Sequence, residues 1–455
     1  MLSNMNFTEK KKEHIDKEAY KVLSLFEDSD EENESIENRE SSSKHQETID
    51  WSDKVIDSPT VIGTTVLDKT VAVRECYKGK CIGLNEDNYR EFLKLTTTIY
   101  NDNLIKSQVS LQFIEKKSLE WFFKSCKEKK VEVAFSTFIL DAMQDSLQEL
   151  KIYFHVLYLD IQKPFNVGHV KFEYFTKEYF DLKEAEKKET DPEIEYASIK
   201  YLRQKIQGKV LTTFIVKAEP IKAEEIAFEN CALAVDVLKM CFDTADAPEL
   251  KLSFDIDIRV KESGQSEVLS STPDAIVDLF TTHLYRLPSH HFIGDNEMVR
   301  MHHRQFQVFH SFLLNLKTEK TELEQLIVNG IKRYGNAISL INLHQRIVEL
   351  FTILESLLLV DENSPIIESV TKYCSKLISK KPMERKGIID TLKIMYKVRS
   401  GFIHHAKEGR FEMQNLFRLQ HIVRMLLAQL IVKSKSHATK QSLLQEIEEA
   451  ILRAY

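Results

Sequence analysis

Glycine is scarce in this chain, and the glycine motifs that bind phosphates are absent. The 455 residues include only 12 glycines. Neither a G-x-G-x-x-G string nor a G-x-x-x-x-G-K-[ST] string occurs among them. The common nucleotide-binding folds cradle phosphates on such glycine-rich backbone. The sequence therefore argues against a nicotinamide-dependent dehydrogenase and against a P-loop nucleotide hydrolase, and we expect no cofactor.

Cysteines and long apolar runs are scarce as well. The six cysteines include one close pair, Cys76 and Cys81, with no second pair at the spacing of a zinc ribbon, so we expect reduced, structural thiols. No run reaches the roughly 18 uncharged apolar residues of a membrane-spanning helix. The N-terminus is rich in Lys and Glu where a signal peptide would be apolar. We expect a cytoplasmic protein without a membrane partner.

The net charge of −7 is concentrated in the first 50 residues. This segment holds 14 acidic and 7 basic residues, so the rest of the chain is neutral overall. Residues 27–46 contain a single aliphatic residue, too little apolar surface to offset the entropy lost on ordering. We predict a disordered acidic arm over residues 1–50, with a short helix near residues 13–26.

The opposite charge gathers near the C-terminus. Residues 372–440 hold 16 Lys and Arg against 4 acidic residues. Such a stretch either covers the solvated faces of helices or attracts a polyanion through phosphate neutralisation and counterion release. On the second interpretation, RNA would bind the cations that open this stretch: Lys372, Lys376, Lys380, Lys381, Arg385 and Lys386.

Periodicity divides the remaining chain into two parts. Up to about residue 271, β-branched and aromatic runs alternate over residues 109–114, 131–135, 152–159, 169–175, 210–216 and 250–256. These runs predict a largely antiparallel sheet, which a helix over residues 224–241 should cover. We therefore predict an α+β domain over residues 51–318 that senses an unknown trigger or regulates the rest of the chain.

From about residue 305 the period becomes helical. The pattern predicts helices over residues 340–358, 366–379, 382–399, 412–432 and 446–453. Short connections between successive helices are typical of an antiparallel bundle. We predict an all-α bundle over residues 319–455.

The helix predicted over residues 382–399 carries an arginine on its apolar face. Its buried stripe of Ile388, Leu392, Met395 and Tyr396 continues at Arg399, a residue type that is rarely buried without a partner.

Ser400 and Gly401 can end this helix, and His404 and His405 follow. Arg399 and His404 would then flank one turn and could converge. The structural alternatives are an arginine that complements the helix dipole and a histidine that caps the helix. The functional alternative joins a permanent cation to a side chain that titrates near neutral pH.

These residues resemble the Arg-x4–6-His motif of HEPN (higher eukaryotes and prokaryotes nucleotide-binding) domains. The motif string is Y-K-V-R-S-G-F-I-H-H at residues 396–405, with Arg399 and His404 separated by four residues. The strings H-Q-R-I-V-E-L-F-T-I-L-E-S-L-L-L (344–359) and E-S-V-T-K-Y-C-S-K-L-I (368–378) precede it. Their order and spacing are similar to Apea-like HEPN domains, and the resemblance covers roughly residues 320–455.

The resemblance implies a metal-independent ribonuclease that uses the 2′-hydroxyl of RNA as nucleophile. His404 would transfer protons and Arg399 would stabilise the charged phosphorane. Such domains usually pair across a symmetric interface, which implies a homodimer or a larger homo-oligomer formed through the bundle. Fusions of this kind often act in prokaryotic antiphage defence, where RNA damage arrests growth in abortive infection.

Two further residues match the family as supports of the motif. Glu355 corresponds to its helix-one acid and would contact Arg399 or Tyr396, the alternative being a structural ion pair. Tyr396 precedes the motif arginine, the alternative being an ordinary core residue.

The chain departs from the family at Ser400, where the most active nucleases often have Asn, and at His405, where Apea-like domains often have Gly. A second interpretation is therefore a non-catalytic HEPN module that binds nucleotide or protein as a scaffold.

Two other candidate sites carry weaker patterns. A metal-dependent hydrolase could use His290, His291, His302 and His303 together with Asp295 and Glu297, although their spacing matches no ligand motif. An aromatic sheet could stack bases, although a core role fits its residues better. The aromatic residues concerned are Phe172, Tyr174, Phe175, Tyr179 and Phe180.

Overall fold

The computed structural model describes eleven stretches of the chain and one single residue between them. They are residues 6–30, 60–66, 69–77, 80–178, 180–181, 184–185, 200, 203–204, 206–242, 254–256, 291–359 and 365–452. The chain divides into two compact units. Unit 1 consists of Met1–Leu150 and Ile215–Ile226, and unit 2 of Lys151–Phe214 and Ala227–Tyr455.

Unit 1 combines a small sheet with helices. Its strands pair antiparallel in the order β1-β4-β3-β2, with bounds Glu27–Asp30 (β1), Thr60–Val66 (β2), Lys69–Tyr77 (β3) and Lys80–Leu84 (β4). The helices are α1 (Glu9–Leu23), α3 (Glu86–Tyr100), α4 (Asn103–Lys106), α5 (Leu111–Glu128) and α6 (Phe135–Asp145). Aromatic side chains make up much of the core between them, among them Phe92, Trp121, Phe122 and Phe135.

Two strands predicted in this region are wrong. Residues 111–114 begin α5, whose first turn is capped by the Ser110 hydroxyl, an acceptor for Phe113 N at 3.1 Å. Residues 131–134 are irregular, and α6 begins at Phe135. Over a segment of only six residues, an alternation of apolar side chains is compatible with one face of a strand. Here the same apolar residues belong to a longer helical repeat.

The short helix expected near residues 13–26 is present as α1, but the disorder predicted for the rest of residues 9–30 is wrong. Helix α1 buries Ile15, Ala19 and Val22 in the core of unit 1, and residues 27–30 form β1. Their acidic composition belongs to the outer face of an amphipathic helix and to an edge strand. Residues 31–50 lie outside the described residues.

The sheet of unit 2 has the strand order β10-β5-β9-β8-β7. Its strands are β5 (Gln148–Leu157), β7 (Phe165–Val167), β8 (Val170–Tyr174), β9 (Val210–Ala218) and β10 (Asp255–Ile256), and β6 (Leu159–Ile161) pairs in parallel with β11 (His291–Ile293). Strands are thus present within the predicted runs at 152–159, 169–175, 210–216 and 250–256, the last only at its end. The predicted helix is α9 (Pro220–Cys241), and its Phe228 ring packs 5.7 Å from Phe154 of the sheet.

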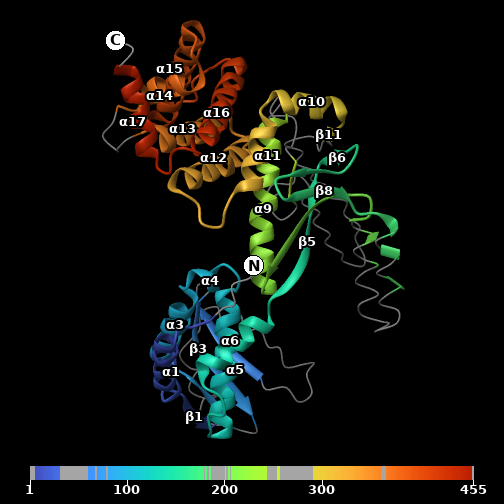
Figure 1. Ribbon diagram of the computed structural model, residues 1–455, viewed down its shortest axis with the longest axis vertical. Coiled ribbons are helices and arrows are strands. Elements are labelled where there is room, and N and C mark those ends of the chain that lie inside the picture. The colour runs from blue at the N-terminus through green and yellow to red at the C-terminus, as the bar shows by residue number, and fades with distance from the viewer. Residues whose placement is uncertain are drawn as a thin grey trace, which may run out of the picture. The chain divides into compact units, whose positions relative to one another are not determined.

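The C-terminal half of unit 2 is helical (Figure 1). The helices are α10 (Asp295–His303), α11 (Phe306–Asn315), α12 (Glu322–Ser339), α13 (Leu343–Leu358), α14 (Ile366–Ile378), α15 (Pro382–His405), α16 (Met413–Lys433) and α17 (Lys440–Leu452). The predicted helical bundle is present. Two of its helices are longer than predicted, because α15 continues past Arg399 and α17 begins at Lys440.

One hydrophobic core joins the sheet of unit 2 to these helices. It contains Val156 and Phe172 from the sheet as well as Leu350 and Leu427 from α13 and α16. The domain boundary predicted between residues 318 and 319 therefore falls within unit 2. Among the described residues, no helix is both long enough and apolar enough to span a membrane.

Buried polar contacts fix α9 against α12. The Lys239 ammonium is fully buried, lies 2.5 Å from a carboxylate oxygen of Asp255 and donates to Ser339 Oγ at 3.1 Å. Gly335 of α12 faces α9 so closely that an added Cβ would lie 2.0 Å from Asp236 Oδ1. Only glycine permits this approach of the two helices.

Candidate active site on helix α15

Helix α15 carries the motif residues without interruption. It begins at Pro382 and ends at His405, followed by Ala406 with a φ of 49° as the cap. The predicted end at Ser400 and Gly401 is wrong. Phe402 explains the difference, because its ring stacks 5.3 Å from His344 of α13 and so holds the last turn in the bundle.

Arg399 meets Glu355 of α13. Its Nη2 lies 3.1 Å from Glu355 Oε1 and donates to Oε2 at 3.3 Å, and the two side chains are 13% and 18% exposed. The expected contact between these residues is therefore present. Burial raises the pKa of Glu355 above its usual value, and the positive charge of Arg399 offsets only part of this rise.

Tyr396 completes this group. The guanidinium carbon of Arg399 lies 5.7 Å from the centre of the Tyr396 ring, which in turn packs edge-on against Phe351. Arg399 Nε is buried and has no hydrogen-bond acceptor among the described residues. The arginine is thus held from three sides by a carboxylate, an aromatic face and the helix itself.

His404 lies on a different side of α15. A separation of five residues in a continuous helix turns a side chain by about 140° and moves it about 7.5 Å along the axis. His404 and His405 are both exposed, whereas Ser400 is half-buried. A single chain therefore does not bring Arg399 and His404 together on one face.

The predicted RNA-binding cations have mixed surroundings. Lys372 pairs with Glu448 at 2.6 Å, Lys381 pairs with Glu384 at 2.9 Å, and Arg385 donates from Nε to the Ser379 carbonyl at 2.7 Å. No ion pair within the described part of the chain involves the other three, which are Lys376, Lys380 and Lys386. All six lie on α14 or near the first turns of α15, and Lys386, the nearest in sequence, precedes Arg399 by about 20 Å of helix.

The histidine pairs do not form a metal site within the described residues. No group of three or more His, Cys, Asp or Glu side chains there could hold a metal ion. His291 is buried between the Phe242 and Phe254 rings, and His302 contacts Gln307. His290 lies outside the described residues.

Sequence reasoning missed the role of His344. Its Nε2 lies 3.0 Å from the Gly409 carbonyl, and its ring contacts both Phe402 and Phe411. A carbonyl only accepts, so Nε2 carries a proton and donates it. His344 thus ties the loop after α15 to α13, beside the end of the helix that bears His404.

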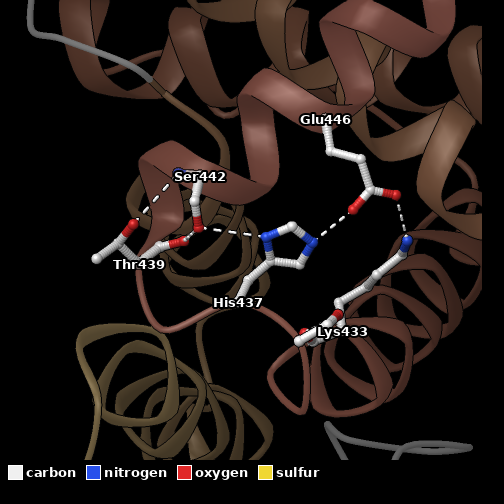
Figure 2. Close-up of polar contacts among 6 residues, drawn as sticks. Lys433, His437, Thr439, Ser442 and Glu446 are labelled. Atoms are coloured by element: carbon white, nitrogen blue, oxygen red, sulfur yellow. Dashed lines mark hydrogen bonds and ion pairs between the residues drawn. The ribbon is translucent and has the colours of Figure 1, made fainter.

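A second group that the sequence analysis missed joins α16 to α17 (Figure 2). His437 lies between Ser442 Oγ, 3.2 Å from its Nδ1, and a carboxylate oxygen of Glu446 at its Nε2. Lys433 pairs with the other oxygen of Glu446 at 2.7 Å, and Thr439 Oγ1 accepts from Ser442 N at 3.2 Å. We call these five residues the α16–α17 clasp.

The clasp has the residue types of a hydrolytic triad, but its contacts are those of a helix start. The Ser442 hydroxyl donates to the Thr439 carbonyl at 2.9 Å, and Glu446 is shared with a lysine that holds its pKa below the usual range. A nucleophilic serine needs its proton directed at the base. Thr439 is a residue type that caps helix N-termini, and this is the signal that would have placed the start of α17 correctly.

Unit 1 contains a groove of about 720 Å³ along α5. Tyr89, Leu119 and Phe123 contribute apolar walls, and burial raises the pKa of the Glu115 carboxyl beside them. A second carboxylate in the groove, Glu75, is buried and pairs with Lys127 at 3.0 Å. The groove is a candidate ligand site in the region from which we expected a response to a trigger.

Comparisons of the chain with protein-family models, with curated proteins and with solved structures found no match. The resemblance to Apea-like HEPN domains therefore depends on the sequence motifs of residues 320–455.

Proposed function

We propose that the chain is a metal-independent endoribonuclease of the HEPN type that acts in prokaryotic antiphage defence by abortive infection. The observation that carries the proposal is the mostly buried Arg399 with its Glu355 partner, followed on the same helix by the exposed His404. The bundle order and the excess of cations around α15 add support. RNA is the partner, and unit 1 with its groove would respond to the trigger.

The proposed reaction breaks one bond in RNA. The ribose 2′-oxygen attacks the adjacent phosphorus, its proton passes to a base, and the 5′-oxygen leaves with a proton from an acid. The products are a 2′,3′-cyclic phosphate and a 5′-hydroxyl. His404 provides base and acid, each role contributing about 10²–10⁴-fold. Arg399 stabilises the negative charge of the phosphorane.

The proposal includes a homodimer with a joint site. Arg399 and His404 leave α15 about 140° apart, so one chain cannot direct both at the same phosphate. A second copy can place its exposed His404 near the Arg399 of the first, and two histidines then supply both the base and the acid. Because Arg399 and His404 lie on different sides of α15, their arrangement favours a catalytic site that two chains share across an interface.

A direct test is cleavage of a fluorescent RNA by the full-length protein in EDTA. We expect cleavage to persist, to give cyclic phosphate ends, and to fall by at least 10²-fold in Arg399→Ala and in His404→Ala. His303→Ala, an exposed histidine of α10, serves as the matched control and should keep wild-type activity. Loss of cleavage in EDTA together with loss in His303→Ala would contradict the proposal and favour the histidine metal site.

The second candidate is a non-catalytic HEPN scaffold that binds nucleotide or protein. It is favoured by the engagement of Arg399 with Glu355 and by Ser400 and His405 at the two positions that differ from active relatives. Expression of wild type and of Arg399→Ala/His404→Ala under triggering conditions separates the candidates. RNA of equal integrity in both, with growth unaffected, would favour the scaffold.

A further inference from the structure

Three lysines and His404 form a single row along the solvent face of α15. Lys386, Lys393, Lys397 and His404 are separated by seven, four and seven residues. At 100° per residue these steps keep all four within about 40° of one another around the helix, over a length of about 27 Å. All four side chains are exposed. We call them the α15 row.

No ion pair within the described part of the chain involves a lysine of this row. Elsewhere in the bundle, lysines of α14 and α16 pair with acids of α17, as Lys372 does with Glu448 and Lys433 with Glu446. One acid, Asp390, lies one turn from both Lys386 and Lys393 and forms an ion pair with neither. The row therefore presents three cations to solvent, with one carboxylate beside them.

The surface beside the row is open and partly apolar. Ile394 is 47% exposed, and it is flanked seven residues away on either side by Gly387 and Gly401. An added Cβ at either glycine would have no atom within 4 Å. A ligand can therefore approach the helix backbone closely next to the lysines.

We propose that the α15 row is the track that binds the phosphates of single-stranded RNA and leads the strand to His404. The inference rests on the proposed function for its choice of polyanion. A straight row one side chain wide suits the backbone of an extended single strand, with bases against the apolar strip at Ile394. The backbone of a duplex would curve away from such a row.

This track differs from the RNA-binding set expected from the sequence, with which it shares only Lys386. The expected set was chosen for its high density of cations and lies around the junction of α14 and α15. The α15 row instead includes Lys393 and Lys397, because helical geometry puts these two lysines on the same face as His404. These two lysines lie between the junction and His404, so a strand bound to them reaches the proposed catalytic histidine.

The test measures binding of a fluorescent single-stranded oligoribonucleotide to full-length protein at several salt concentrations. His404→Ala is the background in every protein, so that no substrate is cut. Lys393→Glu/Lys397→Glu should weaken binding at least tenfold and reduce the slope of log K against log salt by about 1.4, since each single-strand phosphate contact contributes about 0.7. A duplex of the same sequence should bind more weakly than the single strand.

The matched control is Lys317→Glu/Lys320→Glu, which changes the net charge equally at two exposed lysines before α12. It should leave the slope unchanged. Equal slopes in the two double variants would overturn the track. Cleavage is measured separately in proteins that carry the native His404. If the lysine changes alter the salt slope but the protein with native His404 never cuts RNA, the RNA track is supported and the proposed nuclease activity is contradicted. If the protein cuts RNA and the two α15 lysine changes leave cleavage unaffected, only the proposed track is contradicted.

Discussion

The environment of Arg399 combines two opposing electrostatic effects. Its charge is mostly buried and has one carboxylate partner, while burial raises the pKa of that partner. A buried cation that loses its only counter-charge is strongly destabilising, whereas replacing both members of a buried pair by apolar groups can be neutral. The pair therefore makes a specific prediction for single and double variants.

We expect Glu355→Ala to lower the free energy of unfolding by about 1–3 kcal/mol, because it leaves the Arg399 charge unpaired. Glu355→Ala/Arg399→Met should recover at least half of that loss, since the methionine fills the same space without a charge. Urea unfolding of the two single variants, Glu355→Ala and Arg399→Met, and of the double variant measures the difference. Additive losses in the double variant would show that the two residues do not interact in solution.

Helix α15 ends later in the structure than the sequence pattern predicts. Ser-Gly after an apolar stripe is a common stop signal, and it gave a helix end at Ser400. The contacts that extend the helix come from elsewhere in the chain, because Phe402 packs on His344 of α13. Local sequence holds no information about that partner.

The extended helix predicts that Gly401→Ala raises the free energy of unfolding by about 0.5–1 kcal/mol, since alanine loses less entropy in a helix and the added methyl meets no atom. Thermal unfolding of the full chain measures the change. The matched control is Gly335→Ala, where the new methyl would overlap Asp236 and should destabilise the protein strongly. A loss of stability in Gly401→Ala would indicate that the helix ends where the sequence pattern placed it.

The same reasoning explains which other elements could be predicted. Helices α13 and α16 have long apolar repeats, so their periodicity was sufficient to place them within a few residues. Residues 109–114 alternate as a strand would, and only the longer repeat over Leu111–Glu128 distinguishes helix α5 from a strand. In the candidate site, the pairing of Arg399 with Glu355 could be expected from the resemblance to the family motifs. The rotation around the helix axis that separates Arg399 from His404 could not be predicted, because it depends on α15 continuing without a break to His405.

For the whole molecule, the joint site predicts complementation between inactive chains. Arg399→Ala and His404→Ala proteins, mixed and allowed to exchange subunits, should recover cleavage that is measurable but well below that of the wild type, because half of the dimers are mixed and each keeps one arginine and one histidine in the proposed joint site. Mixing Arg399→Ala with Arg399→Ala/His404→Ala should recover none. Full activity in wild-type protein that light scattering shows to be monomeric would contradict the shared site.

The hydrophobic core that unit 2 shares between its sheet and its helices limits how this protein could exchange parts with others. Arg424 of α16 donates to the Met240 carbonyl of α9, and Gly335 of α12 accommodates Asp236 of the same helix. A recombination event or an engineered fusion joined at residue 319 would cut this core and leave its apolar surface to solvent. The helical half of unit 2 is therefore inherited together with its sheet and α9, so that sequence changes that leave this core intact are easiest to acquire in unit 1.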